Sequence, residues 1–301
     1  MSRENRKPYS VEALGLLFGL AAYSLWGLFP LYWKRLDMVP ATQILAHRIV
    51  WAFVFTLFLC LVLGRKKDLA ELFHSPKRLA STFAAGLLIS LNWGVYIWAV
   101  NQSRIIETSL GYYLNPLLSA AMGAFVLREK LDKGMIVAYC VAGLGIVVLT
   151  VSYGKLPWVA LTLALSFAFY GLIKKIAALD ALTGLTVETG AAFPFALAFL
   201  FFEQKAGRGA FGTIGSTGTI MLFMAGLVTA IPLLLYASGI KRLALSKMGF
   251  LQYISPTLQL ILGVFIFGEV VDLTQGIAFG CVVSALLIFG FTRRRIKPAI
   301  A

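Results

Sequence analysis

Residues 112–129 read YYLNPLLSAAMGAFVLRE, and residues 252–269, 140 positions later, read QYISPTLQLILGVFIFGE. Both copies place a tyrosine, a proline, a glycine and a closing glutamate at the same points: Tyr113, Pro116, Gly123 and Glu129 in the first, and Tyr253, Pro256, Gly263 and Glu269 in the second. Tyr96 and Tyr236 keep the same offset upstream of them. A repeated segment of this kind indicates that the chain consists of two related halves.

The segments around this repeat are almost entirely apolar. The 301 residues are 59% hydrophobic and 13% charged, with a mean hydropathy of +0.85, which excludes a soluble domain of this length. Apolar stretches of about 20 residues recur along the chain, and each can cross a bilayer. We therefore predict an all-α, polytopic membrane protein with ten transmembrane helices at residues 12–33, 42–63, 79–101, 105–127, 133–152, 156–174, 184–203, 217–239, 245–267 and 272–291.

The repeat divides these helices into two sets of five, which predicts one unit at residues 1–153 and a second at 154–301. Weaker echoes support the division, since residues 23–27 resemble 167–171 and residues 42–47 resemble 183–188. An odd number of helices in each unit turns the second unit upside down in the membrane. Inverted repeats of this type are common in secondary transporters.

The basic residues predict the orientation. Of the 27 lysines and arginines, 20 fall at the termini or in the connections on one side, 6 fall on the other side, and Arg48 lies within a span. Such a bias predicts that both termini are cytoplasmic. It also accounts for the net charge of +14, so we expect the lipid bilayer, and no nucleic acid, as a partner.

Three ionisable residues inside the predicted spans are candidates for function, because polar groups are costly there. We expect Arg48 to attract an anionic group of a solute, and His47 and Glu188 to be candidates for coupling to protons. The alternative is that these side chains reach the membrane surface or form structural pairs. His47 and Glu188 enter from opposite faces of the membrane, so a direct pair between them is not assumed.

Aromatic and amide side chains supply the candidate solute site. In the third span Asn92 and Tyr96 share a helical face with Trp93 beside them, and Trp26 lies deep in the first span. These groups offer stacking surfaces and hydrogen bonds. The alternative for tryptophan and tyrosine is a belt at the membrane interface.

The fourth and ninth spans, which carry the repeat, add further candidates. Tyr113 in one, and Gln252 and Tyr253 in the other, lie beside a proline, and Tyr236 lies in the eighth span. Pro116 and Pro256 each remove a backbone hydrogen bond, which permits a hinge or, alternatively, a static bend for packing. We expect the tyrosines and Gln252 to contact a solute in a cavity between the two halves.

Motifs for catalysis and nucleotide binding are missing from the sequence. It contains no HExxH, no GxSxG and no phosphate-binding loop, and its two histidines do not form a metal-ligand pattern. We therefore expect no enzyme, no catalytic residue, no cofactor and no metal site. Transport without a nucleotide site would depend on a gradient or be passive.

The sequence resembles the EamA-type branch of the drug/metabolite transporter superfamily. Residues 91–98 and 107–116, with Trp26, Pro30, Tyr32 and the His47–Arg48 pair, more narrowly resemble its RarD group. This resemblance covers nearly the whole chain, and it implies a permease of the bacterial inner membrane that works by alternating access between inverted halves.

From these observations we expect a secondary transporter for a small organic metabolite or drug-like solute. The alternative is an intramembrane lipid-handling protein or enzyme. Export and import are both open, and so are the identity of the solute, its coupling to protons and a monomeric or homodimeric state.

Overall fold

Helices make up the entire fold in the computed structural model, which describes residues 10–101, 105–154, 158–266, 268 and 273–294. No strand occurs among these residues. In chain order the helices are α1 (Val11–Trp33), η1 (Lys34–Leu36), α2 (Ala41–Val62), α3 (Lys66–Phe73), α4 (Pro76–Asn101), α5 (Ile105–Phe125), α6 (Lys133–Tyr153), α7 (Trp158–Ala177), α8 (Ala181–Lys205), α9 (Gly215–Ile240), α10 (Leu245–Leu251), α11 (Ile254–Phe265) and α12 (Leu273–Arg294).

All ten predicted spans have counterparts in these helices. Among the described residues, seven helices are long and apolar enough to cross a membrane by length and composition: α1, α2, α4, α6, α7, α8 and α9. The remaining predicted spans correspond to α5, to α10 and α11 together, and to α12. The short helices η1 and α3 lie in connections. The predicted all-α fold with ten spans is therefore confirmed.

Two aspartates define where helices of the bundle begin. The Asp132 carboxylate accepts a hydrogen bond of 2.8 Å from the Met135 amide at the start of α6. The Asp180 carboxylate accepts bonds of 3.2 Å from the amides of Leu182 and Thr183 at the start of α8. Caps of this type satisfy amides that have no partner inside the helix.

The ninth predicted span is broken into α10 and α11, with Gln252 and Tyr253 in the turn between them. Pro256 has no backbone N–H, so the Gln252 carbonyl loses its ordinary helical partner. The chain tightens instead, because the Ser255 amide donates to the Gln252 carbonyl at 3.0 Å. Pro116, at the equivalent place, lies inside the unbroken helix α5. The hinge role of the two prolines stays a prediction.

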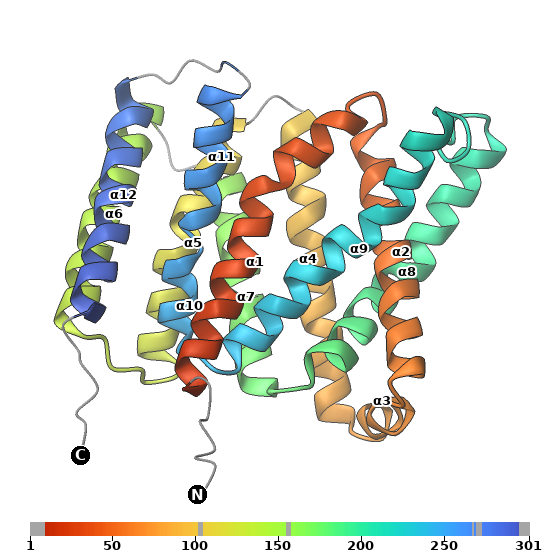
Figure 1. Ribbon diagram of the computed structural model, residues 1–301, viewed down its shortest axis with the longest axis horizontal. Coiled ribbons are helices and arrows are strands. Elements are labelled where there is room, and N and C mark those ends of the chain that lie inside the picture. Colours follow the sequence, from red (N-terminus) through yellow and green to blue (C-terminus); the bar gives the residue numbers. More distant parts are fainter. Residues whose placement is uncertain (1–9, 102–104, 155–157, 267, 269–272, 295–301) are drawn as a thin grey trace, which may run out of the picture.

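The contacts between the two halves are reciprocal. Helix α1 packs on α9 and α11, while α7, its counterpart, packs on α4 and α5. In the same way, α2 packs on α9, and its counterpart α8 packs on α4. Three further contacts join a helix to its own counterpart: α2 with α8, α5 with α10, and α6 with α12. Such reciprocity is what an approximate two-fold axis between related halves produces. The start of α1 and the end of α12 lie on one face (Figure 1), and α7, preceded by five spans, starts on the opposite face.

Glycines at equivalent places allow two of these contacts to be close. A Cβ on Gly86 of α4 would lie 2.7 Å from the Glu188 carbonyl oxygen of α8. A Cβ on Gly226 of α9, again 140 positions later, would overlap the backbone of Trp51 on α2. Small residues of this kind let transmembrane helices approach each other closely.

Glu129, which closes the first repeat segment, ties the two halves together. Its Oε1 accepts a bond of 2.6 Å from the Leu245 amide, and its Oε2 accepts bonds of 3.0 and 2.7 Å from the amide and hydroxyl of Ser246. A carboxylate of the first half therefore caps α10 of the second, where the helix dipole favours negative charge. A Cβ on Gly123 would lie 3.1 Å from the Ser246 amide nitrogen, so this glycine is a close contact point. Glu269 lies outside the described residues.

Candidate functional site

Five aromatic side chains meet between α1, α7 and α9, and we call them the aromatic centre: Tyr23, Trp26, Phe167, Tyr170 and Tyr236. The Tyr236 ring contacts the other four, with centroid distances between 5.6 and 6.1 Å. Trp26 and Phe167, which belong to the two segments that echo each other in the sequence, lie edge to face at 6.1 Å. The aromatic centre therefore joins the two halves at their seam.

Glu188 of α8 lies beside the aromatic centre in a buried ion pair. Its Oε1 is 2.7 Å from the Lys174 Nζ of α7, and its Oε2 accepts a bond of 3.1 Å from the Tyr170 hydroxyl. The Glu188 side chain is 3% exposed and the Lys174 side chain 9%. Two charges removed from water to this degree stabilise each other, and loss of either partner leaves the other uncompensated.

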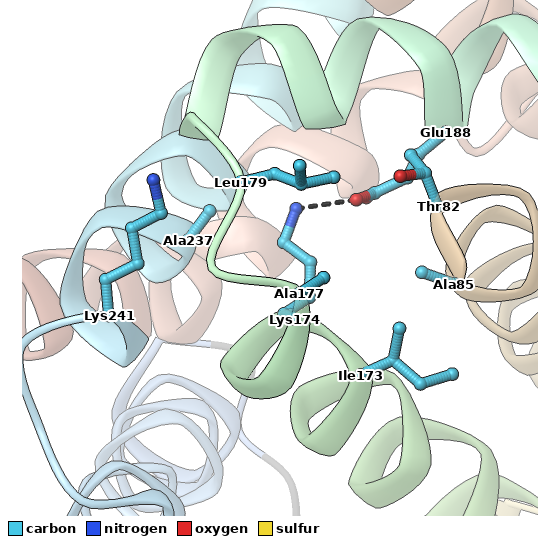
Figure 2. Close-up of a pocket in the computed structure, with 9 residues that line it drawn as sticks. All are labelled: Thr82, Ala85, Ile173, Lys174, Ala177, Leu179, Glu188, Ala237 and Lys241. Atoms are coloured by element: carbon cyan, nitrogen blue, oxygen red, sulfur yellow. Dashed lines mark hydrogen bonds and ion pairs between the residues drawn. The ribbon is translucent and has the colours of Figure 1, made fainter. Parts of the chain in front are cut away.

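Two small cavities flank this ion pair, and Glu188 lines both. We call the first the Lys241 cavity, because Lys241 lies across it from Glu188 with Lys174 between them (Figure 2). The second, the Trp93 cavity, is lined by Trp93, Tyr170 and Thr189 as well as Glu188. Each has a volume of about 10 Å³, room for roughly one water molecule.

The sequence predicts a cavity of solute size at the seam, and in this conformation neither of these two cavities is large enough. The rings of the aromatic centre fill the space between α1, α7 and α9. Gly171 contributes to this packing, since a Cβ there would lie 2.6 Å from the Tyr236 hydroxyl. The described seam is therefore closed around Glu188.

Arg48 forms a second polar group in the bundle, at the opposite end of the seam from Lys241. Its guanidinium carbon lies 4.9 Å from the centre of the Trp33 ring and 5.0 Å from that of Trp93. Its Nε donates a hydrogen bond of 3.0 Å to the Thr229 hydroxyl. No carboxylate of the described residues lies within ion-pair distance of it.

Tyr96 and Tyr112 accompany Arg48. Their rings lie 5.7 Å apart, and both are close enough to interact electrostatically with the guanidinium. The structure thus brings the predicted residues Arg48, Trp93 and Tyr96 together. We call them, with Trp33, Tyr112 and Thr229, the Arg48 group.

The side chain of Asn92 is bonded to α7. Its side-chain amide donates bonds of 2.8 Å to the Leu163 carbonyl and 2.9 Å to the Ser166 hydroxyl. These bonds hold α4 against α7. The amino group of Asn92 is therefore engaged within the protein, and its contact with a solute stays a prediction.

Tyr113, Gln252 and Tyr253 lie together where α5 meets the turn between α10 and α11. The Tyr253 hydroxyl donates to the Tyr113 carbonyl at 3.4 Å. The Tyr113 hydroxyl and the Gln252 Oε1 are buried, and neither has a hydrogen-bond partner among the described residues. Such unpaired groups are rare in native proteins, and they leave these two residues as candidates for contact with a solute.

His47 does not pair with Glu188 in the described structure. The His47 ring stacks on Phe211 at 5.2 Å, and its buried Nδ1 has no hydrogen-bond partner among the described residues. In the part of the chain that the structure describes, no group of three or more histidine, cysteine, aspartate or glutamate side chains could hold a metal ion.

Sequence reasoning missed three of these contacts: Lys174 with Glu188, and Trp33 and Thr229 with Arg48. Lys174 lies at the end of a span, where a base is ordinarily read as an orientation signal. One available signal is that Tyr170 and Lys174 are four residues apart, which places both on one face of α7 toward a buried carboxylate.

The fold and these sites define a class of protein: a multi-pass membrane protein built from two inverted, five-span halves. The model of the EamA-like transporter family matches the chain twice, at residues 13–151 and 156–291. The chain therefore belongs to the EamA-like transporter family, and it is a membrane transporter. The division into units at 1–153 and 154–301 stays a prediction.

Comparison with known proteins agrees with this membership. The chain is similar to the "Uncharacterized transporter YojE" of Bacillus subtilis, with 44% identity over 95% of this chain and 96% of that protein. It is 40% identical to "Protein RarD" of Streptomyces exfoliatus, over 94% of this chain and 90% of that one. A solved structure titled "Crystal structure of protein" matches 95% of the chain with a TM-score of 0.71 and 19% identity, which supports the fold alone.

Proposed function

We propose that this transporter carries a small organic solute with an anionic group, by alternating access of its two inverted halves. The solute passes along the seam, between the Arg48 group on one side and Glu188 on the other. The observation that carries the proposal is Arg48, a cation within the bundle that lies over two tryptophan rings and has no carboxylate partner among the described residues.

The geometry of Arg48 favours an oxygen anion as its partner. A charged side chain inside a membrane protein ordinarily pairs with another group or marks a pathway for a solute. Of its five N–H groups, the one on Nε donates to Thr229, and the four on the terminal nitrogens have no protein acceptor among the described residues. That edge of the guanidinium fits a carboxylate through two parallel hydrogen bonds.

Alternating access is supported by the symmetry of the contacts. Because each half presents equivalent helices to the other, the seam can open at either end by exchange of equivalent contacts. The closed seam with its two water-sized cavities represents one state of this cycle. The Arg48 group lies on one side of the closure and the Lys241 cavity on the other.

A thermal-shift screen of the purified protein tests the proposal, because a solute that binds the folded state stabilises it. The panel pairs aromatic and aliphatic carboxylates with their neutral amides. We expect a carboxylate to raise the unfolding temperature where its amide does not, and we expect that carboxylate to cross the membrane of reconstituted vesicles.

The matched variants are Arg48→Gln and Arg35→Gln. Arg35 is exposed in η1, near the same face of the bundle. Loss of charge-assisted hydrogen bonds at Arg48 should weaken binding about 10- to 100-fold, whereas Arg35→Gln should leave it unchanged. Equal responses to carboxylates and amides, or equal binding by both variants, would contradict the proposal.

A further inference from the structure

We propose that Glu188 is the proton-binding site of the transport cycle, and that Lys174 is a tethered cation which takes the place of the proton when the seam is closed. This inference rests on the proposed function and adds the coupling ion to it. It assigns Lys174 a role as the positioning partner of Glu188, in addition to its place among the basic residues that predict the orientation.

The contacts of Glu188 provide the first step. Both of its carboxylate oxygens are occupied, one by the Lys174 ammonium at 2.7 Å and the other by the Tyr170 hydroxyl at 3.1 Å. With only 3% of the side chain exposed, water cannot compensate the carboxylate if Lys174 leaves. The pair therefore cannot separate unless another positive charge arrives.

The position of the pair between the two cavities provides the second step. Glu188 lines both the Lys241 cavity and the Trp93 cavity, and Lys174 lines the first. Glu188 therefore lies at the boundary between the two cavities, and its partner Lys174 lies on the side of the face where Lys241 lies (Figure 2).

A proton fits this position better than a metal cation. Neutralising a carboxylate requires one proton, taken from water at the Lys241 face and bound to a Glu188 oxygen, while Lys174 keeps its own charge. Hard metal cations require several oxygen ligands. Glu188 supplies the one carboxylate here, and no group of three acidic, histidine or cysteine side chains occurs in the described part of the chain.

The other charged groups around Glu188 are few. The titratable side chains that face it are Lys174 and Tyr170 from α7, Tyr236 from α9, and Lys241, which directly follows α9. Helix α4 presents Thr82, which does not titrate, and the Cys60 thiol of α2 pairs with Thr186 instead, at 3.4 Å. Among these groups, Lys174 alone forms an ion pair with the carboxylate in the described structure.

Tyr170 connects the protonation of Glu188 to the aromatic centre. Its hydroxyl donates to the carboxylate, and its ring stacks on Tyr236 with centroids 5.9 Å apart and planes 14° apart. A hydrogen bond to a charged acceptor is stronger than one to a neutral acceptor. Protonation therefore loosens Tyr170, and with it the packing between α7 and α9 that closes the seam.

Cysteine labelling in membrane vesicles tests this role without any solute. The background replaces Cys60, Cys140 and Cys281 by alanine and must unfold at the unaltered temperature. The reporter is Ser90→Cys, which lines the Trp93 cavity behind the pair, and the matched control is Ala177→Cys, which lines the Lys241 cavity in front of it. A small charged thiol reagent is added at the Lys241 face.

We expect labelling of Ser90→Cys to increase as the pH falls, by at least about threefold, because protonation releases Lys174 from Glu188. Labelling of Ala177→Cys should follow only the ordinary pH dependence of a thiol. The ratio of the Ser90→Cys rate to the Ala177→Cys rate corrects for this dependence. Glu188→Gln should make the ratio high at every pH. Lys174→Gln should shift the rise to higher pH, since the uncompensated carboxylate then binds a proton more readily.

Lys247→Gln is the control for loss of a surface charge, and it should leave the profile unchanged because Lys247 pairs with Glu12 at the surface. An unaltered, pH-dependent ratio in both Glu188→Gln and Lys174→Gln would overturn the proposal. A ratio that follows sodium, at constant pH, would also overturn it and assign the site to a metal cation. Since no solute is present, these results are independent of whether Arg48 binds a carboxylate.

Discussion

The hydroxyl of Tyr253 donates a hydrogen bond of 3.4 Å to the backbone carbonyl of Tyr113, and these two tyrosines are equivalent residues of the two repeats. Equivalent residues that touch each other lie close to the axis that relates the halves. The contact is not symmetric, however. The buried Tyr113 hydroxyl has no partner among the described residues, and its ring packs on Phe279 at 5.4 Å.

This asymmetry predicts opposite effects for the same substitution at equivalent positions. Tyr253→Phe removes a hydrogen bond and should lower the free energy of unfolding by about 0.5–1.5 kcal/mol. Tyr113→Phe removes a buried hydroxyl without a partner, so it should be neutral or stabilising. Thermal unfolding of the two variants in the same detergent measures the difference. Equal destabilisation by both would show that the two hydroxyls have equivalent surroundings.

Two glycines of α4 provide a second matched pair. Gly86→Ala places a methyl group 2.7 Å from the Glu188 carbonyl oxygen, and the resulting overlap should cost about 1–3 kcal/mol of stability. Gly94 lies in the same helix, and a Cβ there meets nothing within 4 Å. Gly94→Ala should therefore stabilise the protein by about 0.5–1 kcal/mol through the helix preference of alanine. The order of the two unfolding temperatures checks both statements.

Much of this architecture could be predicted from the sequence, because it depends on local or periodic signals. Apolar length predicts the ten spans, and the repeated tyrosine, proline, glycine and glutamate predict two related halves. The polar residues Arg48 and Glu188 stand out for their cost in a membrane. None of these inferences requires knowledge of which helices are neighbours.

The contacts of the candidate sites depend on that knowledge, and the sequence does not contain it in readable form. Lys174 and Glu188 are in different helices, and only the packing of α7 and α8 beside α4 brings them within 2.7 Å. Pro116 and Pro256 occupy equivalent places, yet only the helix before Pro256 is broken, and the sequence does not predict this difference.

The Glu129 cap supplies a third prediction. Glu129→Ala leaves the amides of Leu245 and Ser246 without their acceptor and should lower the free energy of unfolding by about 2–3 kcal/mol. Glu129→Gln keeps one acceptor oxygen and should cost less. The control is Glu12→Ala, which breaks the surface ion pair with Lys247 and should cost about 0–1 kcal/mol. A Glu129→Ala variant as stable as Glu12→Ala would show that the cap does not tie the halves together.

The two repeat prolines give the last prediction, which separates a hinge from a static bend. Pro256→Ala restores a backbone N–H that can bond to the Gln252 carbonyl, so α10 and α11 should become one helix. If the break is a hinge, this variant should be at least as stable as the unaltered protein, yet exchange solute across vesicle membranes about tenfold or more slowly. Pro116→Ala, in the unbroken α5, should change the exchange rate much less. Comparable exchange by the two variants, with intact stability, would mean that the break at Gln252 and Tyr253 serves packing, because a rigid ninth span would then permit the full cycle.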